Sequence, residues 1–168
     1  VLQYAPTTSR VYEIPVLVMT PQVNRYYFLD LAPGRSFIEY MTGQGFQAFI
    51  VSWKNPGPEQ GYWRLDDYCM ALNEAIDAVI AISGSDAINT FGFCAGGITM
   101  SALLSYLNQS GQGHKINAIS YAVTLMDFSQ PAMIGVLKSD YLLRSAKRGS
   151  HNKGVLEGDK LAAVFTLL

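Results

Sequence analysis

Short apolar runs alternate with longer amphipathic patterns along most of this chain, and this alternation limits the fold more than any other feature. The first run, 14–19, reads IPVLVM and is followed by Pro21, and further apolar runs cover 46–53, 87–93 and 116–126. A continuous apolar run of this length indicates a strand that is buried on both faces. Strands that alternate with helices predict an α/β fold, with a mostly parallel sheet joined by crossover helices.

The segments between these runs have the spacing of helices. Apolar residues recur at helical spacing from 65 to 83, and Gly84 follows as a residue that commonly ends a helix. Helices are also predicted over 36–43 and 95–107. One strand therefore ends just before Cys94 and a helix begins just after it, so the cysteine lies at a strand-to-helix junction.

Composition and charge exclude several classes of protein. The 168 residues are 49% hydrophobic and 15% charged, which predicts one folded domain rather than a disordered chain. A net charge of -1 provides no long-range field that would attract nucleic acid or an anionic membrane. The first fifteen residues lack the basic start and apolar stretch that mark a secretion signal, and no window approaches about 18 uninterrupted apolar residues. We therefore expect no nucleic acid, no transmembrane segment and, unless the sequence is part of a longer one, a cytosolic protein.

Cysteine and histidine are too scarce for a structural metal site. The chain has two cysteines, Cys69 and Cys94, and two histidines, His114 and His151, and neither cysteine belongs to a CxxC pair. We therefore expect no metal. Cys69 falls inside the predicted helix 65–83, with no turn and no basic neighbour, and is predicted to be a core thiol.

The sequence around Cys94 is typical of a nucleophile on a sharp turn. Gly92 and Gly96 stand at the two positions where side chains would clash with the strand and the helix, and Gly97 follows. The pattern resembles the G-x-S-x-G elbow of α/β-hydrolases, with sulfur in place of oxygen. The start of the helix favours a thiolate, and the Ala95 N–H is a candidate oxyanion donor. The pattern alone leaves a buried structural cysteine as the alternative.

A cysteine nucleophile needs a base, usually a histidine oriented by a carboxylate, and both follow the nucleophile in hydrolase chain order. His114 is expected at the end of the sheet away from the elbow, and both it and His151 are interpreted as surface residues. Asp127 is interpreted as a turn or cap carboxylate. The sequence therefore predicts a nucleophile without identifying its base. The candidates after the cysteine are His114, His151, Asp127, Asp140, Glu157 and Asp159.

Basic residues gather near the end of the sequence. Six of the twelve Lys and Arg residues fall between Lys138 and Lys160. Such a run is either a solvated surface or a local patch beside an anionic ligand, and the sequence favours the first.

Four stretches, taken in order, resemble the polyhydroxyalkanoate synthases, bacterial enzymes that polymerise hydroxyacyl-CoA thioesters. The resemblance spans nearly the whole chain and corresponds to the central portion of the catalytic domain. The stretches are IPVLVMTPQVNRYYFLDLAPGRSFIEY, QAFIVSWKNP, GFCAGG and KGVLEGDKLAAVFTLL.

This resemblance implies roles for individual residues. Cys94 matches the catalytic cysteine that carries the growing acyl chain as a thioester. Val23 matches the loop position whose backbone N–H joins that of Ala95 in the oxyanion hole. The family's histidine and aspartate lie downstream, in segments absent from this sequence. The resemblance thus implies the nucleophile-bearing part of an α/β-hydrolase-like domain over 1–127 and the start of a cap over 128–168, with the sheet truncated before its last strands and the fragment inactive alone.

The resemblance also implies the reaction and its setting. The substrates would be an (R)-3-hydroxyacyl-CoA and the polyester chain, with release of CoA and no metal or prosthetic group. The family acts as a homodimer in the cytoplasm, at the surface of polyester granules, and the basic stretch 144–153 would be available to CoA phosphates. Monomer length stays open, although the motifs are nearer to medium-chain members. The alternatives are a cysteine-dependent hydrolase or thioesterase and a catalytically dead interaction module.

Overall fold

The chain forms two compact units. The first comprises Val1–Trp53 and Arg64–Leu125, and the second comprises Lys54–Trp63 and the chain from Met126 onward. The predicted division into a nucleophile-bearing part over 1–127 and the start of a cap over 128–168 stays a prediction, because a compact unit is not by itself a cap. The computed structural model describes residues 1–23, 25–129 and 140–158.

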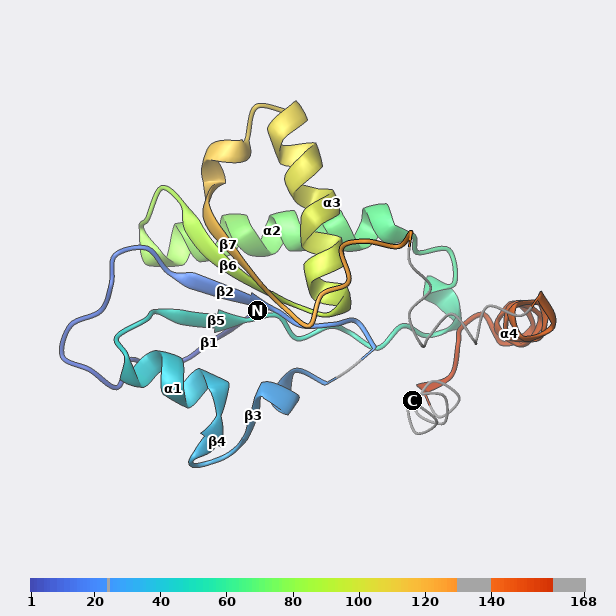
Figure 1. The fold of residues 1–168 in the computed structure, drawn as a ribbon, viewed down its shortest axis with the longest axis horizontal. Coiled ribbons are helices and arrows are strands. Elements are labelled where there is room, and N and C mark those ends of the chain that lie inside the picture. Colours follow the sequence, from blue (N-terminus) through green and yellow to red (C-terminus); the bar gives the residue numbers. More distant parts are fainter. Residues whose placement is uncertain (24, 130–139, 159–168) are drawn as a thin grey trace. The chain divides into compact units, whose positions relative to one another are not determined.

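A largely parallel sheet forms the centre of the first unit. Its described strands are β1 (Leu2–Gln3), β2 (Val16–Met19), β5 (Ala48–Ile50), β6 (Ile88–Phe93) and β7 (Ile116–Ala122). Their order across the sheet is β1-β5-β2-β6-β7 (Figure 1). β1 pairs antiparallel with β5. The other pairs, β5 with β2, β2 with β6 and β6 with β7, are parallel. The predicted α/β fold with a mostly parallel sheet is confirmed.

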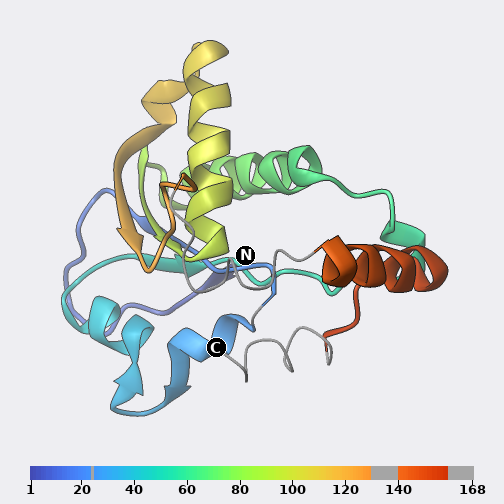
Figure 2. The same ribbon diagram turned by 45° about the vertical axis from the view of Figure 1, so that its right-hand side comes forward.

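Three helices of the described residues cover this sheet. They are α1 (Phe37–Gly43), α2 (Leu65–Ser83) and α3 (Ala95–Gln109). In Figures 1 and 2, α2 and α3 lie on one face of the sheet and α1 lies on the other. Gly84 ends α2 in the left-handed conformation with φ of 72°, as its sequence position predicts. The Ser36 hydroxyl accepts a hydrogen bond from Glu39 N–H at 2.9 Å and so caps the start of α1.

The alternation of side chains along β2 joins the two faces into one unit. Val16 and Val18 belong to the apolar cluster that contains Ile38 of α1. Leu17 and Met19 point to the opposite face and belong to the cluster formed with α2 and α3. All four residues of β2 are buried, which confirms the prediction of a strand covered on both faces.

Several predicted boundaries are wrong, and short elements were missed. The apolar run 116–126 is a strand only as far as Ala122, because Val123 turns the chain with φ of 47°. The strand expected over 46–53 is confined to β5, and the first strand begins at Val16 rather than at residue 14. The sequence did not indicate β1, nor η1 (Tyr26–Leu29), nor the antiparallel pair β3 (Asp30–Ala32) and β4 (Arg35–Ser36).

The second unit contains α4 (Asp140–Lys153) and the short helix η2 (Pro58–Gln60). Gly61 and Gly154 come close together, since a Cβ on Gly61 would lie 2.5 Å from the Gly154 carbonyl oxygen. The basic stretch 144–153 lies within α4, and its Lys and Arg side chains are exposed. This arrangement agrees with the favoured interpretation of a solvated surface. No helix of the described residues is long and apolar enough to cross a membrane.

Candidate active site

Cys94 occupies a strained turn between β6 and α3. Its backbone has φ of 48° and ψ of -121°, a conformation that non-glycine residues adopt rarely and at a cost in free energy. The Cys94 N–H donates to Ala122 O at 3.0 Å, and Cys94 O accepts from Gly97 N–H at 3.0 Å. The Cys94 side chain is exposed, so the alternative of a buried structural thiol does not describe it. The predicted strand-turn-helix junction is present.

The glycines around Cys94 allow three backbone segments to meet. A Cβ on Gly92 would lie 2.6 Å from the Gly97 Cα, and one on Gly96 would lie 2.8 Å from Thr20 O. A Cβ on Gly97 would overlap the side chain of Thr124. Real Cβ atoms do not approach other atoms so closely, so each glycine is required by the packing of the turn. This is the physical reason for the G-x-C-x-G-G pattern.

The two predicted oxyanion donors, Ala95 and Val23, follow neighbouring strands of the sheet. Ala95 is the first residue of α3, and its N–H donates no hydrogen bond to any described residue. β2 lies next to β6 with Met19 opposite Gly92, so the loop after β2 and the turn at Cys94 lie at the same edge of the sheet. Val23 belongs to that loop, and its side chain is exposed. Val23 and Ala95 thus follow adjacent strands, although their part in an oxyanion hole stays a prediction.

Hydrogen bonds that the sequence did not reveal hold the loop after β2 in place. The Thr20 hydroxyl donates to Val51 O at 2.8 Å, and Trp53 Nε1 donates to Thr20 O at 2.8 Å. Further along the loop, Gln22 Nε2 donates to Thr99 Oγ1 of α3 at 2.7 Å. These hydrogen bonds connect the loop both to the segment that follows β5 and to α3, the helix that follows Cys94.

The candidate base His114 is far from Cys94. It lies in η3 (Gly113–Lys115), immediately before β7. β6 and β7 are parallel, from Ile88 opposite Ile116 to Phe93 opposite Ala122, so His114 and Cys94 lie at opposite ends of the same strand pair. At about 3.3 Å per residue this separation is about 20 Å. The expectation that His114 lies away from the elbow is confirmed.

The remaining candidates belong to the second unit. His151 is an exposed residue of α4, as expected. Asp127 is exposed and accepts a hydrogen bond from Ser129 N–H at 2.8 Å, which agrees with its interpretation as a turn carboxylate. Hydrogen bonds from Ser129 lower the pKa of Asp127. Glu157 pairs with Lys153 at 2.6 Å, and Asp159 lies outside the described residues.

Cys69 is buried, whereas Cys94 is exposed. Its side chain is 6% exposed, within the apolar cluster below α2 and α3. Its Sγ contacts Thr99 O at 3.7 Å. Burial, and secondarily the charge of Asp66, raise the pKa of the Cys69 thiol. The prediction that Cys69 is a core thiol is confirmed.

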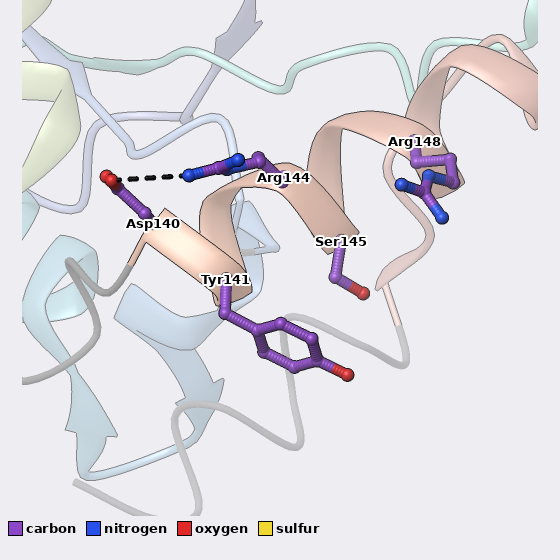
Figure 3. A pocket seen from close by; sticks show the side chains of 5 residues that line it. All are labelled: Asp140, Tyr141, Arg144, Ser145 and Arg148. Atoms are coloured by element: carbon purple, nitrogen blue, oxygen red, sulfur yellow. Dashed lines mark hydrogen bonds and ion pairs between the residues drawn. The ribbon is translucent and has the colours of Figure 1, made fainter.

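A pocket lies along α4 in the second unit (Figure 3). Arg144 approaches Asp140 at 3.5 Å, so part of its charge is balanced within the same helix, whereas Arg148 lies farther along. Exposed arginines on a single helix bind anions only weakly, and contact with CoA phosphates stays a prediction. No described residues gather three or more His, Cys, Asp or Glu side chains around a possible metal. The pocket is lined by Asp140, Tyr141, Arg144, Ser145 and Arg148.

A parallel sheet carrying an exposed residue on a sharp strand-to-helix turn is the arrangement of the α/β hydrolase fold. The family model described as alpha/beta hydrolase fold matches residues 24–143, and the chain belongs to this family. Within it, the resemblance to polyhydroxyalkanoate synthases is confirmed by a second family model and by named relatives. Residues 1–41 match the model of the poly-beta-hydroxybutyrate polymerase (PhaC) N-terminus.

Each relative matches this chain with only a part of its own length. Poly(3-hydroxyalkanoate) polymerase 1 of Ectopseudomonas oleovorans is 41% identical over 98% of this chain. The poly(3-hydroxyalkanoate) polymerase subunit PhaC of Cupriavidus necator is 36% identical over 99% of it. A PhaC subunit of Haloferax mediterranei is 36% identical over 63% of the chain and 22% of its own length. The chain spans 29% of the length of each of the first two relatives.

Proposed function

We propose that this chain carries the nucleophile of a polyhydroxyalkanoate synthase, an acyltransferase, and that Cys94 is that nucleophile. The observation that carries the proposal is the exposed Cys94 thiol on its strained turn, in a chain whose relatives are named poly(3-hydroxyalkanoate) polymerases. Steric strain of this kind persists where the surrounding structure enforces it and is frequent at active sites.

The proposed reaction begins with attack of the Cys94 thiolate on the thioester carbonyl of an (R)-3-hydroxyacyl-CoA. The new C–S bond forms as the carbonyl oxygen becomes an oxyanion, and the bond to the CoA sulfur then breaks, releasing CoA as its thiolate. The hydroxyl of a second acyl unit attacks the enzyme thioester, loses its proton to a base, and forms the ester bond while the cysteine thiolate is regenerated. No metal or prosthetic group takes part in these steps.

The oxyanion would be stabilised by the backbone N–H groups of Ala95 and Val23. Preorganised donors at such a position lower the barrier substantially, because they need no reorganisation when charge develops. Support comes from the Ala95 N–H at the start of α3, which donates to no described residue, and from the register that brings the loop after β2 to the same sheet edge.

A base has to come from elsewhere than the first unit. His114 is the histidine of that unit, and it lies at the opposite end of β7 from Cys94. Since the resemblance places the family's histidine and its carboxylate partner in segments downstream of this sequence, we propose that these 168 residues alone are inactive and that another part of the full protein supplies both groups. The resemblance further supports a homodimer that works at the surface of cytoplasmic polyester granules.

The decisive experiment uses the protein expressed from its whole reading frame and incubates it with (R)-3-hydroxybutyryl-CoA and (R)-3-hydroxyoctanoyl-CoA. We expect polymer with stoichiometric CoA release, and a trapped acyl group on the peptide that contains Cys94. Cys94→Ala should abolish both, whereas the matched variant Cys69→Ala should keep the acyl-enzyme. Free hydroxy acid as the product would instead establish a thioesterase, and absence of any acyl-enzyme would establish an interaction module.

A further inference from the structure

We propose that Gln22 and Thr99 form a positioning pair that sets the distance between the two oxyanion donors, Val23 and Ala95. The inference rests on the proposed function, because it concerns how the oxyanion hole of that reaction is held. Neither residue touches the reacting atoms in this proposal. Each acts through the backbone of a donor.

Two consecutive hydrogen bonds connect the two donor segments. Gln22 Nε2 donates to Thr99 Oγ1 at 2.7 Å, and the Thr99 hydroxyl donates in turn to Ala95 O at 2.9 Å. The hydroxyl therefore uses its single proton toward Ala95 and a lone pair toward Gln22, so both bonds form at once. Thr99 is 2% exposed, so neither bond competes strongly with water.

The position of Gln22 in the chain makes this connection relevant to Val23. The Val23 N–H belongs to the peptide unit that begins at the Gln22 carbonyl, so anchoring Gln22 restricts the orientation of that N–H. Within the described part of the chain, the other side-chain hydrogen bonds to this loop are made at Thr20, with Val51 O and Trp53 Nε1. Among the described residues, Gln22 makes the side-chain hydrogen bond nearest to Val23 in this loop.

The other end of the pair acts on the start of α3. Thr99 lies one turn after Ala95 and donates to its carbonyl, while the Ala95 N–H donates no hydrogen bond to any described residue. A Cβ on Gly96 would overlap Met19 O and lie 2.8 Å from Thr20 O, so the start of α3 is already pressed against the end of β2. The hydrogen bond between Gln22 and Thr99 is a second, polar connection between the loop after β2 and α3, next to this contact.

The expected effect is on the step that develops an oxyanion. Removing one oxyanion donor outright lowers kcat by about 10²- to 10³-fold, so a donor that is retained but misplaced should slow acylation by about 10- to 100-fold. Alkylation of the same thiol by iodoacetamide forms no oxyanion at a carbonyl carbon. It reports thiolate reactivity and access alone, and should be unchanged if the pair acts on the donors.

The experiment measures single-turnover acylation by (R)-3-hydroxybutyryl-CoA and alkylation by iodoacetamide, both at Cys94, in the protein from the whole reading frame. The variants are Gln22→Ala, Thr99→Val, which keeps the shape but removes the hydroxyl, and Thr99→Ser, which keeps it. Gln109→Ala, an exposed residue at the last turn of α3, is the matched control. Circular dichroism confirms that each variant is folded.

We expect about 10- to 100-fold slower acylation in Gln22→Ala and Thr99→Val, with alkylation within twofold of the parent, and near-parental acylation in Thr99→Ser and Gln109→Ala. The double variant Gln22→Ala/Thr99→Val should acylate no more slowly than the slower of the two single variants, because both substitutions break the same hydrogen-bonded connection. Unchanged acylation, or equal losses in acylation and alkylation, would overturn the pair. Acylation that survives Cys94→Ala would show that the proposed function itself is wrong, and the pair proposal would fall with it.

Discussion

Gly96 at the start of α3 lies so close to Thr20, the first residue after β2, that a Cβ on the glycine would be 2.8 Å from the Thr20 carbonyl oxygen. This approach brings the turn that carries Cys94 against the loop that carries Val23. Since β2 and β6 are neighbouring parallel strands, the contact places the nucleophile and a candidate donor loop at one edge of the sheet. The geometry of the candidate site thus depends on the absence of a side chain.

Gly96→Ala should therefore destabilise the first unit. The added methyl group meets backbone atoms that cannot rotate away, and overpacking of this kind costs about 1–3 kcal/mol. The free energy of unfolding from denaturant titration measures the effect. Gly43→Ala is the matched control, because nothing lies within 4 Å of its Cβ position, and alanine there should be neutral or stabilising by up to about 1 kcal/mol. Equal stability of the two variants would contradict this account.

The two thiols should react at very different rates. Cys94 is exposed, whereas Cys69 is 6% exposed and has its pKa raised by burial. Because the thiolate is the reactive form, iodoacetamide at neutral pH should alkylate Cys94 at least about tenfold faster, and the difference should narrow only as pH rises or the protein unfolds. Peptide mapping by mass spectrometry gives both rates. Equal, slow alkylation at both positions would remove the basis for a nucleophile at Cys94.

The central elements were predictable because their signals are local. β2 is a continuous apolar run, and α2 combines helical spacing with a glycine stop. The junction at Cys94 was predictable for the same reason, since the strand, the glycines and the helix adjoin in sequence. β1 was not, because a pair of exposed residues becomes a strand only through pairing with β5. The end of β7 was missed because the apolar run continues past the turn at Val123.

The contacts that complete the candidate site could not be predicted from local pattern. Gln22 and Thr99 are 77 residues apart, and a glutamine after a strand or a threonine in a helix has many other uses. Their contact becomes predictable only once β2 and β6 are known to be parallel neighbours. The segments that follow these two strands, which carry Gln22 and Thr99, then meet at one edge of the sheet. The sequence left the basic segment open as a loop or a helix, because Gly149 and the flanking serines interrupt a run of good helix formers, Leu, Arg, Lys and Ala, that forms α4.

The ionisation of Asp127 provides a test of the turn in the second unit. Hydrogen bonds from Ser129 lower the pKa of Asp127, so their contribution to stability is present above the unfolded-state pKa and is lost as pH falls through the folded-state pKa. Ser129→Ala removes the hydroxyl bond but keeps the backbone bond, and should raise the pKa of Asp127 toward its ordinary value. Carboxyl NMR titration measures it. Ser110→Ala, whose hydroxyl bonds Leu107 O, is the control and should leave Asp127 unchanged.

Tyr4 should be the last tyrosine to ionise when the folded protein is titrated with alkali. Burial, together with the hydrogen bond from its hydroxyl to Asp30 Oδ2 at 2.7 Å and the charge of that carboxylate, raises the pKa of Tyr4. Tyr4→Phe should lower the free energy of unfolding by about 1 kcal/mol at neutral pH, because the hydrogen bond is lost. Since the folded-state pKa is raised, this contribution is complete below the unfolded-state pKa, about 10, and declines as pH rises through the folded-state pKa.

Two measurements check this prediction about Tyr4. Ultraviolet absorbance should show that the final ionisation step among the ten tyrosines disappears in Tyr4→Phe. Tyr40→Phe is the matched control, since Tyr40 is 62% exposed on α1, and it should leave both the last step and the stability unchanged. If the two variants unfold with the same free energy at pH 7, the bond between Tyr4 and Asp30 does not stabilise the fold. That result would leave the β3 segment held to the sheet by apolar contacts of Leu29 and Tyr26 rather than by the carboxylate of Asp30.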